Sequence, residues 1–245
     1  MFSRGLQSFV RSCCNTVLCN SVLVHRCSSQ WIAVCHPFVQ TILSSPQPQR
    51  MLHGTKQKIK IAALRMYTCC VERINYDEFF EKCQLPDTLN SWFLVTQLHV
   101  WMCLVRMKQE GRAGKYMCRY VVHSMWEDVE QRGKVMGIDS VTLKESLKAM
   151  TENFYAAIFG YDEGILSDDC VLAAALWRNL FNKQCEDPTV LELMVEYVRK
   201  QMQYLDSLNG EDLLLSGEVK WRPLLETDPQ SILKPVSPTY NDEGL

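Results

Sequence analysis

The sequence predicts an all-α fold: an irregular multi-helix bundle with a flexible N-terminal head and a polar C-terminal tail. From Lys58 onward apolar residues recur at helical spacing, and no alternating run is typical of a strand. Hydrophobic residues make up 47% of the 245 residues, which is enough for a substantial core. We therefore divide the chain into a head (1–57), a helical domain (58–225) and a tail (226–245).

The segment Leu85–Gly111 is predicted to be a helix buried in the core. Asp87 or Thr88 offers a capping oxygen at its start, and Gly111 suits the left-handed residue that closes a helix. Between these positions apolar side chains occupy almost the whole helical circumference, which is typical of a core helix. A membrane span is disfavoured because polar residues, Gln97 among them, interrupt the run.

The next segment, from Arg112 to Val135, is predicted to be an amphipathic helix that stops near Gly137. Its expected apolar face comprises Tyr116, Tyr120, His123 and the region of Trp126. The rest of the helix carries a basic stripe, defined here as Arg112, Lys115 and Arg119.

Capping signals mark the helices that follow. Apolar spacing predicts a helix from Ser140 to Phe159, ended by Gly160 and followed by a linker of glycines and acids. Asp168 places a capping oxygen and a negative charge at the start of another helix. Asp187-Pro188 opens a further helix, since proline at the first helical position lacks only an amide that would be unpaired. After Trp221, prolines and weak periodicity predict an extended or disordered tail.

The head differs from the rest of the chain in charge. No acidic residue precedes Glu72, although the net charge of the whole chain is −2. An acid-free, Ser-rich start that carries arginines is typical of a mitochondrial transit peptide, which is the targeting role that we predict. A disordered N-terminus whose acid-free composition is accidental explains the same pattern.

The cysteines and acidic residues predict no metal site and no cofactor. Of the twelve cysteines, those after Cys70 are solitary, and the chain contains no C-x-x-C pair of the kind that zinc sites use. Scattered thiols in a reducing compartment are the simpler interpretation. The acidic connector Asp162–Asp169 lacks the alternating oxygen ligands of an EF-hand.

No catalytic motif is present: the sequence lacks a P-loop, a dinucleotide-binding glycine pattern, a nucleophile elbow and an H-E-x-x-H pair. An enzyme would require His99 or His123 to meet Cys103 or Cys118 as a thiolate–imidazole pair. Hydrogen-bonded core histidines explain the pattern better, so we predict no catalytic residues.

Two groups of residues are candidate contacts with other molecules. Four tryptophans in predicted helices are candidates for contact with a client or partner, with core packing as the alternative: Trp92, Trp101, Trp126 and Trp177. The basic stripe is a candidate contact with an anionic surface, either lipid or RNA phosphates, although such stripes are often only solvated. A second basic patch suits an anionic membrane: Lys56, Lys58, Lys60 and Arg65.

Several segments resemble the ubiquinol-cytochrome c chaperone family, mitochondrial assembly factors for respiratory complex III. They include SWFLVTQLHVWMCLVRMKQEG from Ser91, GKYMCRYVVHSMWEDVEQRGKVMG from Gly114, FYAAIFGYDEGILSDD from Phe154, and the segment Cys185–Leu225. The resemblance covers about Lys58 to the C-terminus. It implies a non-enzymatic assembly factor that binds and stabilises newly made cytochrome b and supports its translation.

The same resemblance implies partners and a location. The partners are a small complex III assembly factor, nascent cytochrome b and the mitochondrial ribosome, with peripheral association on the matrix side of the inner membrane. Family members carry further helical sequence before the segment equivalent to Lys58–Tyr67, where this chain has PQPQRMLHGTKQ. We therefore expect the first helix of the family domain to be missing and a core face to be uncovered. The alternative function is a helical RNA-binding or ribosome-associated translational activator.

Overall fold

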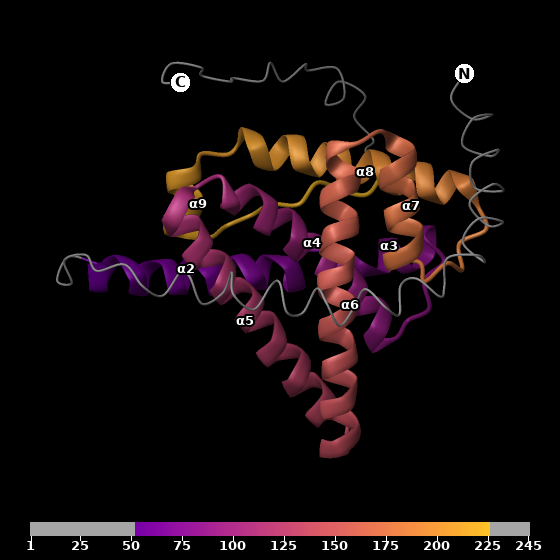
Figure 1. Ribbon diagram of the computed structural model, residues 1–245, viewed down its shortest axis with the longest axis horizontal. Coiled ribbons are helices and arrows are strands. Elements are labelled where there is room, and N and C mark those ends of the chain that lie inside the picture. The colour runs from indigo at the N-terminus through magenta and orange to yellow at the C-terminus, as the bar shows by residue number, and fades with distance from the viewer. Residues whose placement is uncertain (1–51, 226–245) are drawn as a thin grey trace. The chain divides into compact units, whose positions relative to one another are not determined.

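The computed structural model describes residues 52–225, and every regular element in this range is a helix (Figure 1). The all-α prediction is confirmed, while the predicted head and tail lie largely outside the described residues. The described residues from Lys58 onward belong to one compact unit. The helices are α2 (Leu52–Glu72), α3 (Tyr76–Lys82), α4 (Leu89–Lys108), α5 (Gly111–Val135), α6 (Ser140–Leu166), α7 (Asp169–Asn179), α8 (Pro188–Ser207) and α9 (Gly210–Ser216).

Helix α4 forms the centre of the core, as predicted from its apolar circumference. The side chain of Thr88 caps it by accepting a hydrogen bond from the Ser91 amide at 3.2 Å. Helices α3, α5, α6 and α8 all contact α4, and Val95, Leu98 and Val100 are fully buried among them. Within residues 52–225, no helix combines the length and the apolarity that crossing a membrane requires.

Helix α5 buries a different face from the predicted one. Its buried apolar positions follow one another at intervals of four: Met117, Val121, Met125 and Val129. His123, expected on the apolar face, is exposed, and its Nε2 atom lies 3.3 Å from Glu127. The observed and predicted faces differ by about one residue, roughly 100° around the helix. Methionine and valine occupy the core because burying an imidazole without a partner costs more.

Helix α6 continues past the position at which the sequence predicted its end. Gly160 lies inside the helix, which ends only at Leu166. A Cβ atom on Gly164 would lie 2.8 Å from the Cα atom of Leu172 in α7, so glycine permits the close packing of the two helices. Glycine is less favourable than alanine inside a helix by about 1 kcal/mol. The close packing of α6 on α7 more than offsets this cost.

The predicted starts of α7 and α8 are confirmed by their caps. The Asp168 carboxylate accepts a hydrogen bond from the Val171 amide at 3.1 Å. Asp187 accepts one from the Thr189 amide at 2.9 Å, and Pro188 occupies the first position of α8. Both carboxylates also face the positive end of a helix dipole.

The segment after α9 returns to the core and packs against α2, α4 and α8. The Trp221 indole donates to the Cys69 carbonyl of α2 at 3.0 Å, and its ring lies 4.6 Å from the His99 ring. The Gln201 side chain in α8 donates to the Arg222 carbonyl at 2.8 Å and accepts from the Arg222 amide at 3.3 Å. This segment therefore belongs to the helical core up to at least Arg222.

Candidate functional site

The histidine–cysteine pair that an enzyme would require is not formed in the described part of the chain. His99 is fully buried; its Nδ1 donates to the Val95 carbonyl at 2.7 Å, and its Nε2 accepts from the Tyr197 hydroxyl at 2.6 Å. Burial lowers the pKa of His99 to about 4, so the ring is neutral near pH 7. The Cys103 sulfur lies beside the Cys70 sulfur instead, at 3.8 Å. His99 is therefore the hydrogen-bonded core histidine that the sequence favoured.

Burial disfavours the reactive thiolate form of several cysteines between residues 52 and 225. All seven cysteines described there are free. Burial raises the pKa of Cys83 and of Cys118 to about 12, and it raises the pKa of Cys70 as well. The thiolate is the nucleophile and the metal ligand, so these side chains stay protonated and inert. No group of three or more His, Cys, Asp or Glu residues in this range could hold a metal ion.

The four candidate contact tryptophans pack against different neighbours. Trp101 is 0% exposed, and its indole donates to the Asp162 carboxylate at 2.7 Å. Contact between Trp101 and a partner would require the core to open. Trp177 is half-buried, and its indole donates to the Cys185 carbonyl at 3.0 Å.

The other two tryptophans are half-buried and lie around α4. The Arg132 guanidinium stacks 4.2 Å from the Trp92 ring centre, and Trp126 packs at 5.6 Å from both Phe93 and Phe154. Client contact through Trp92, Trp126 and Trp177 stays a prediction.

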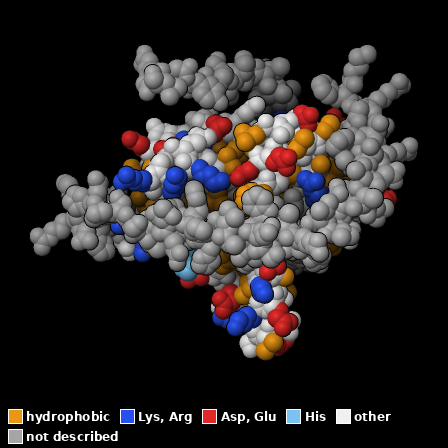
Figure 2. All heavy atoms as spheres, viewed as in Figure 1, with side chains coloured by type: hydrophobic (Ala, Val, Ile, Leu, Met, Phe, Trp, Pro, Cys, Tyr) orange, Lys and Arg blue, Asp and Glu red, His pale blue; other side chains and the backbone are white. Residues whose placement is uncertain are grey.

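The basic stripe of α5 is exposed, and a second group of cations lies on α2, which contacts α5. Arg112, Lys115 and Arg119 are exposed, and none makes an ion pair with another described residue. The Lys60 ammonium of α2 lies 4.7 Å from the centre of the Tyr120 ring, which joins the two helices at this surface. Lys and Arg side chains gather over the region where α4 ends and α5 begins (Figure 2).

We call the combined surface the cationic face and define it as Lys58, Lys60, Arg65, Arg112, Lys115 and Arg119. Neither residues 58–71 nor residues 111–126 include an acidic side chain. Two apolar residues, Ile61 and Leu64, are 48% and 55% exposed within it. On the helical wheel of α2, cations flank this apolar pair on both sides. Elsewhere on α5 the cations are neutralised, as in the pair of Arg132 with Asp128.

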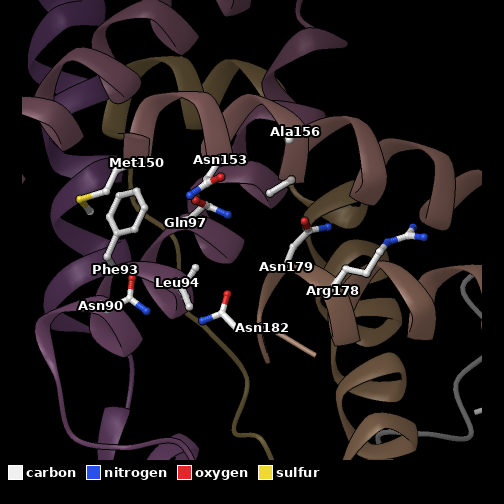
Figure 3. A pocket seen from close by; sticks show the side chains of 11 residues that line it. Asn90, Phe93, Leu94, Gln97, Met150, Asn153, Ala156, Arg178, Asn179 and Asn182 are labelled. Carbon is white, nitrogen blue, oxygen red and sulfur yellow. The ribbon is translucent and has the colours of Figure 1, made fainter. Parts of the chain in front are cut away.

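A small polar pocket opens between α4, α6 and the end of α7 (Figure 3). Its volume is about 140 Å³. Carboxamide side chains dominate its lining: Asn90, Gln97, Asn153, Asn179 and Asn182. Phe93 and Met150 provide an apolar wall. Sequence reasoning missed this pocket because its residues come from three separate helices and share no motif.

Gln97 is the unusual member of the pocket. Its side chain is only 1% exposed, and neither its amide nitrogen nor its amide oxygen has a hydrogen-bond partner among the described residues. Buried polar groups are nearly always paired, and an unpaired one costs about 1–3 kcal/mol. In the sequence, Gln97 stands out only as an interruption of an apolar run.

Comparison with known proteins identifies relatives of this chain. The family model "Ubiquinol-cytochrome C chaperone" matches residues 81–221. "Ubiquinol-cytochrome-c reductase complex assembly factor 1" of Xenopus laevis is 85% identical over 194 residues, which cover 79% of this chain and 97% of the frog protein. The Homo sapiens protein of that name is 74% identical over 194 residues, which cover 79% of this chain and 65% of the human protein.

A solved structure shares the fold. The crystal structure of the Cbp3 homolog from Brucella abortus matches with a TM-score of 0.61 and 23% sequence identity. The match covers 71% of this chain and 96% of the bacterial chain. The helical arrangement of the described region therefore occurs in a protein of distant sequence.

Proposed function

This chain belongs to the ubiquinol-cytochrome c chaperone family, and we propose that it is a non-enzymatic assembly factor for mitochondrial respiratory complex III. The observation that carries the proposal is the 85% identity to the frog assembly factor, of which the match covers 97%. Assembly requires binding area for unassembled subunits rather than catalytic groups. The half-buried aromatic residues and the cationic face supply such area.

The proposed client is newly made cytochrome b, which the protein stabilises and whose translation it supports on the matrix side of the inner membrane. A small complex III assembly factor and the mitochondrial ribosome are the proposed partners. Cytochrome b is a polytopic membrane protein, and its lipid-facing surface needs cover until it is assembled. Trp92, Trp126 and Trp177 suit that role because partly exposed tryptophans bury large apolar areas at interfaces.

The cationic face supports a peripheral association with the inner membrane. Exposed Ile61 and Leu64, flanked by Lys58, Lys60 and Arg65, are typical of a helix that lies at the surface of an anionic bilayer. Each cation near such a surface contributes about 1 kcal/mol of attraction. RNA phosphates would attract the same cations, but the exposed apolar pair favours lipid over RNA.

The proposal is tested in cells that lack their own complex III assembly factor. The tagged chain is expressed with its natural N-terminus and, in parallel, behind a validated mitochondrial presequence. We expect restored complex III on blue native gels and co-purification of cytochrome b with a small partner protein. Rescue that requires the added presequence would contradict a targeting role for the head. An imported chain that restores no complex III and retains no cytochrome b would contradict the assembly role.

A further inference from the structure

We propose that the polar pocket between α4, α6 and α7 binds an uncharged amide, the main-chain peptide group of a partner polypeptide that inserts against Gln97. The identity of this polypeptide as a client or partner in assembly rests on the function proposed above. The chemistry of the pocket is independent of that function.

Gln97 presents a donor and an acceptor side by side in a buried position. Its nitrogen and its oxygen both lack partners among the described residues, and its side chain lines the pocket next to Asn153 (Figure 3). A ligand that satisfies it must therefore accept and donate at adjacent positions. A peptide group does so through its C=O and N–H, whereas a carboxylate only accepts and an ammonium only donates.

The chain contains this pairing at another position. Gln201, which is also fully buried, donates through Nε2 to the Arg222 carbonyl at 2.8 Å. Its Oε1 accepts from the amide of the same residue at 3.3 Å. A buried glutamine thus holds a piece of extended main chain in place by two hydrogen bonds. Gln97 has the same chemical groups at the same depth, with the matching segment not supplied by the described chain.

The α6 side of the pocket is uncharged and carries one polar residue, Asn153, beside Met150, Ala156 and Ala157. Asn153 of α6 faces Gln97 in Figure 3, and Asn90 and Asn182 line the edges. No carboxylate lines the pocket, and its one charged lining residue, Arg178, is exposed and directs its guanidinium away from Gln97. Neutral carboxamides on both sides suit a neutral ligand that donates and accepts along its length.

The size of the pocket points to a short piece of polypeptide rather than a cofactor. A volume of about 140 Å³ is close to the roughly 150 Å³ of an engineered cavity that holds one benzene-sized molecule. Pockets for cofactors and drug-sized ligands are larger, roughly 300–1,000 Å³. One peptide group with a small side chain fits the space. Phe93 and Met150 would cover its apolar part, and methionine adapts readily to different side chains.

The binding test uses the full chain and a neutral probe with two peptide groups, N-acetylalanine N′-methylamide. Nuclear magnetic resonance follows the side-chain amide signals of Gln97 and Asn153 during titration. We expect saturable shifts of both, at least tenfold weaker binding in Gln97→Met, and no shift of these signals with sodium acetate. Gln201→Met is the matched control, because it removes a paired glutamine outside the pocket and should keep probe binding.

The urea midpoint of unfolding is a second readout. A purely structural role for Gln97 would not reproduce the result expected for it. Gln97→Met should raise the urea midpoint of unfolding because it removes two unpaired buried atoms, whereas Gln201→Met should lower it. If Gln97→Met lowers the midpoint as much as Gln201→Met and the probe causes no saturable shift, Gln97 is a hydrated core residue and the proposal is overturned.

The cellular arm separates this inference from the proposed function. In cells rescued by the chain, Gln97→Met should reduce recovery of cytochrome b or of the small partner several-fold at unchanged protein level. Unchanged recovery despite lost probe binding would overturn the assignment of the pocket to assembly. Saturable probe binding by a chain that restores no complex III would instead contradict the proposed function and support the amide site.

Discussion

Three buried polar side chains of α4 and α8 differ in how the fold satisfies them. His99 and Gln201 each have two hydrogen-bond partners within the protein, while Gln97 has none among the described residues. The distinction matters because an unpaired buried group destabilises the fold whereas a paired one is nearly neutral or stabilising. Neither condition follows from residue type, since Gln97 and Gln201 are chemically identical. Tyr197 and Arg222, which lie 98 and 21 residues away from His99 and Gln201, decide the outcome.

His99 makes stability depend on pH. Its folded pKa of about 4 lies below the value of about 6.5 expected for the unfolded chain, so the unfolded state binds the proton first as the pH falls. The stability that neutral His99 confers is complete above about pH 6.5 and is lost as the pH falls towards 4. Between pH 7.5 and pH 5.0 the expected loss is about 2 kcal/mol, and His99→Gln should abolish most of it. Urea unfolding at the two pH values measures this difference.

His123 provides the matched control for that experiment. It is exposed beside Glu127, so His123→Gln should retain the pH dependence of the unchanged chain. If His99→Gln and the unchanged chain lost the same stability on acidification, another group would be responsible and the burial of His99 would not be the cause.

At the scale of helices, capping signals were more reliable than stop signals. Thr88, Asp168 and Asp187 all cap the helices that the sequence assigned to them, because a cap involves only residues two or three positions away. Gly160 was wrongly predicted to end α6, since its effect depends on α7, which packs against it. The buried face of α5 was misjudged for the same reason: several faces were apolar enough, and the neighbouring helices selected one of them.

Close packing of α6 on α7 predicts unequal effects of two alanine substitutions. Gly164→Ala should lower the free energy of unfolding by about 1–3 kcal/mol, because its Cβ would lie 2.8 Å from the Leu172 backbone. At Gly160 the nearest atom is the movable Asn179 amide at 3.0 Å. Gly160→Ala should therefore be neutral, or stabilising by up to about 1 kcal/mol through helix propensity. Urea unfolding of both variants compares them, and equal stability would contradict the described packing.

At the scale of the whole domain, helices distant in sequence combine their charges. The cations of α2 and α5 belong to helices that meet where Lys60 lies over Tyr120, although the chain as a whole is slightly acidic. Because such a surface acts through its summed potential, loss of several charges should have a larger effect than loss of any one.

The cationic face predicts binding to anionic vesicles. We expect the chain to float with vesicles that contain cardiolipin and not with phosphatidylcholine alone, and to dissociate as salt is raised. Changing the basic stripe in the triple variant Arg112→Glu, Lys115→Glu and Arg119→Glu should weaken flotation at least tenfold. The control triple variant changes exposed cations outside the cationic face and should float normally: Lys144→Glu, Lys148→Glu and Lys183→Glu.

A further pair of substitutions separates lipid from RNA as the ligand of the cationic face. Ile61→Ser and Leu64→Ser together should reduce flotation and leave any RNA affinity unchanged, because apolar side chains enter the bilayer and do not contact phosphates. Equal flotation of the two triple variants would contradict the membrane proposal, and strong RNA binding lost only with the basic stripe would favour the translational-activator alternative.

The sequence by itself determined the all-α class, the buried character of α4, the capped starts of α7 and α8, and the exposure of the basic stripe. Each follows from residues within about one helical turn or from the composition of one segment, so no knowledge of neighbours is needed. Only the tertiary structure decided which face α5 buries, how far α6 extends, and that Gln97 and Asn153 line one pocket while Gln201 is hydrogen-bonded to Arg222. These depend on contacts between segments remote in sequence, where shape and hydrogen-bond satisfaction outweigh local preference.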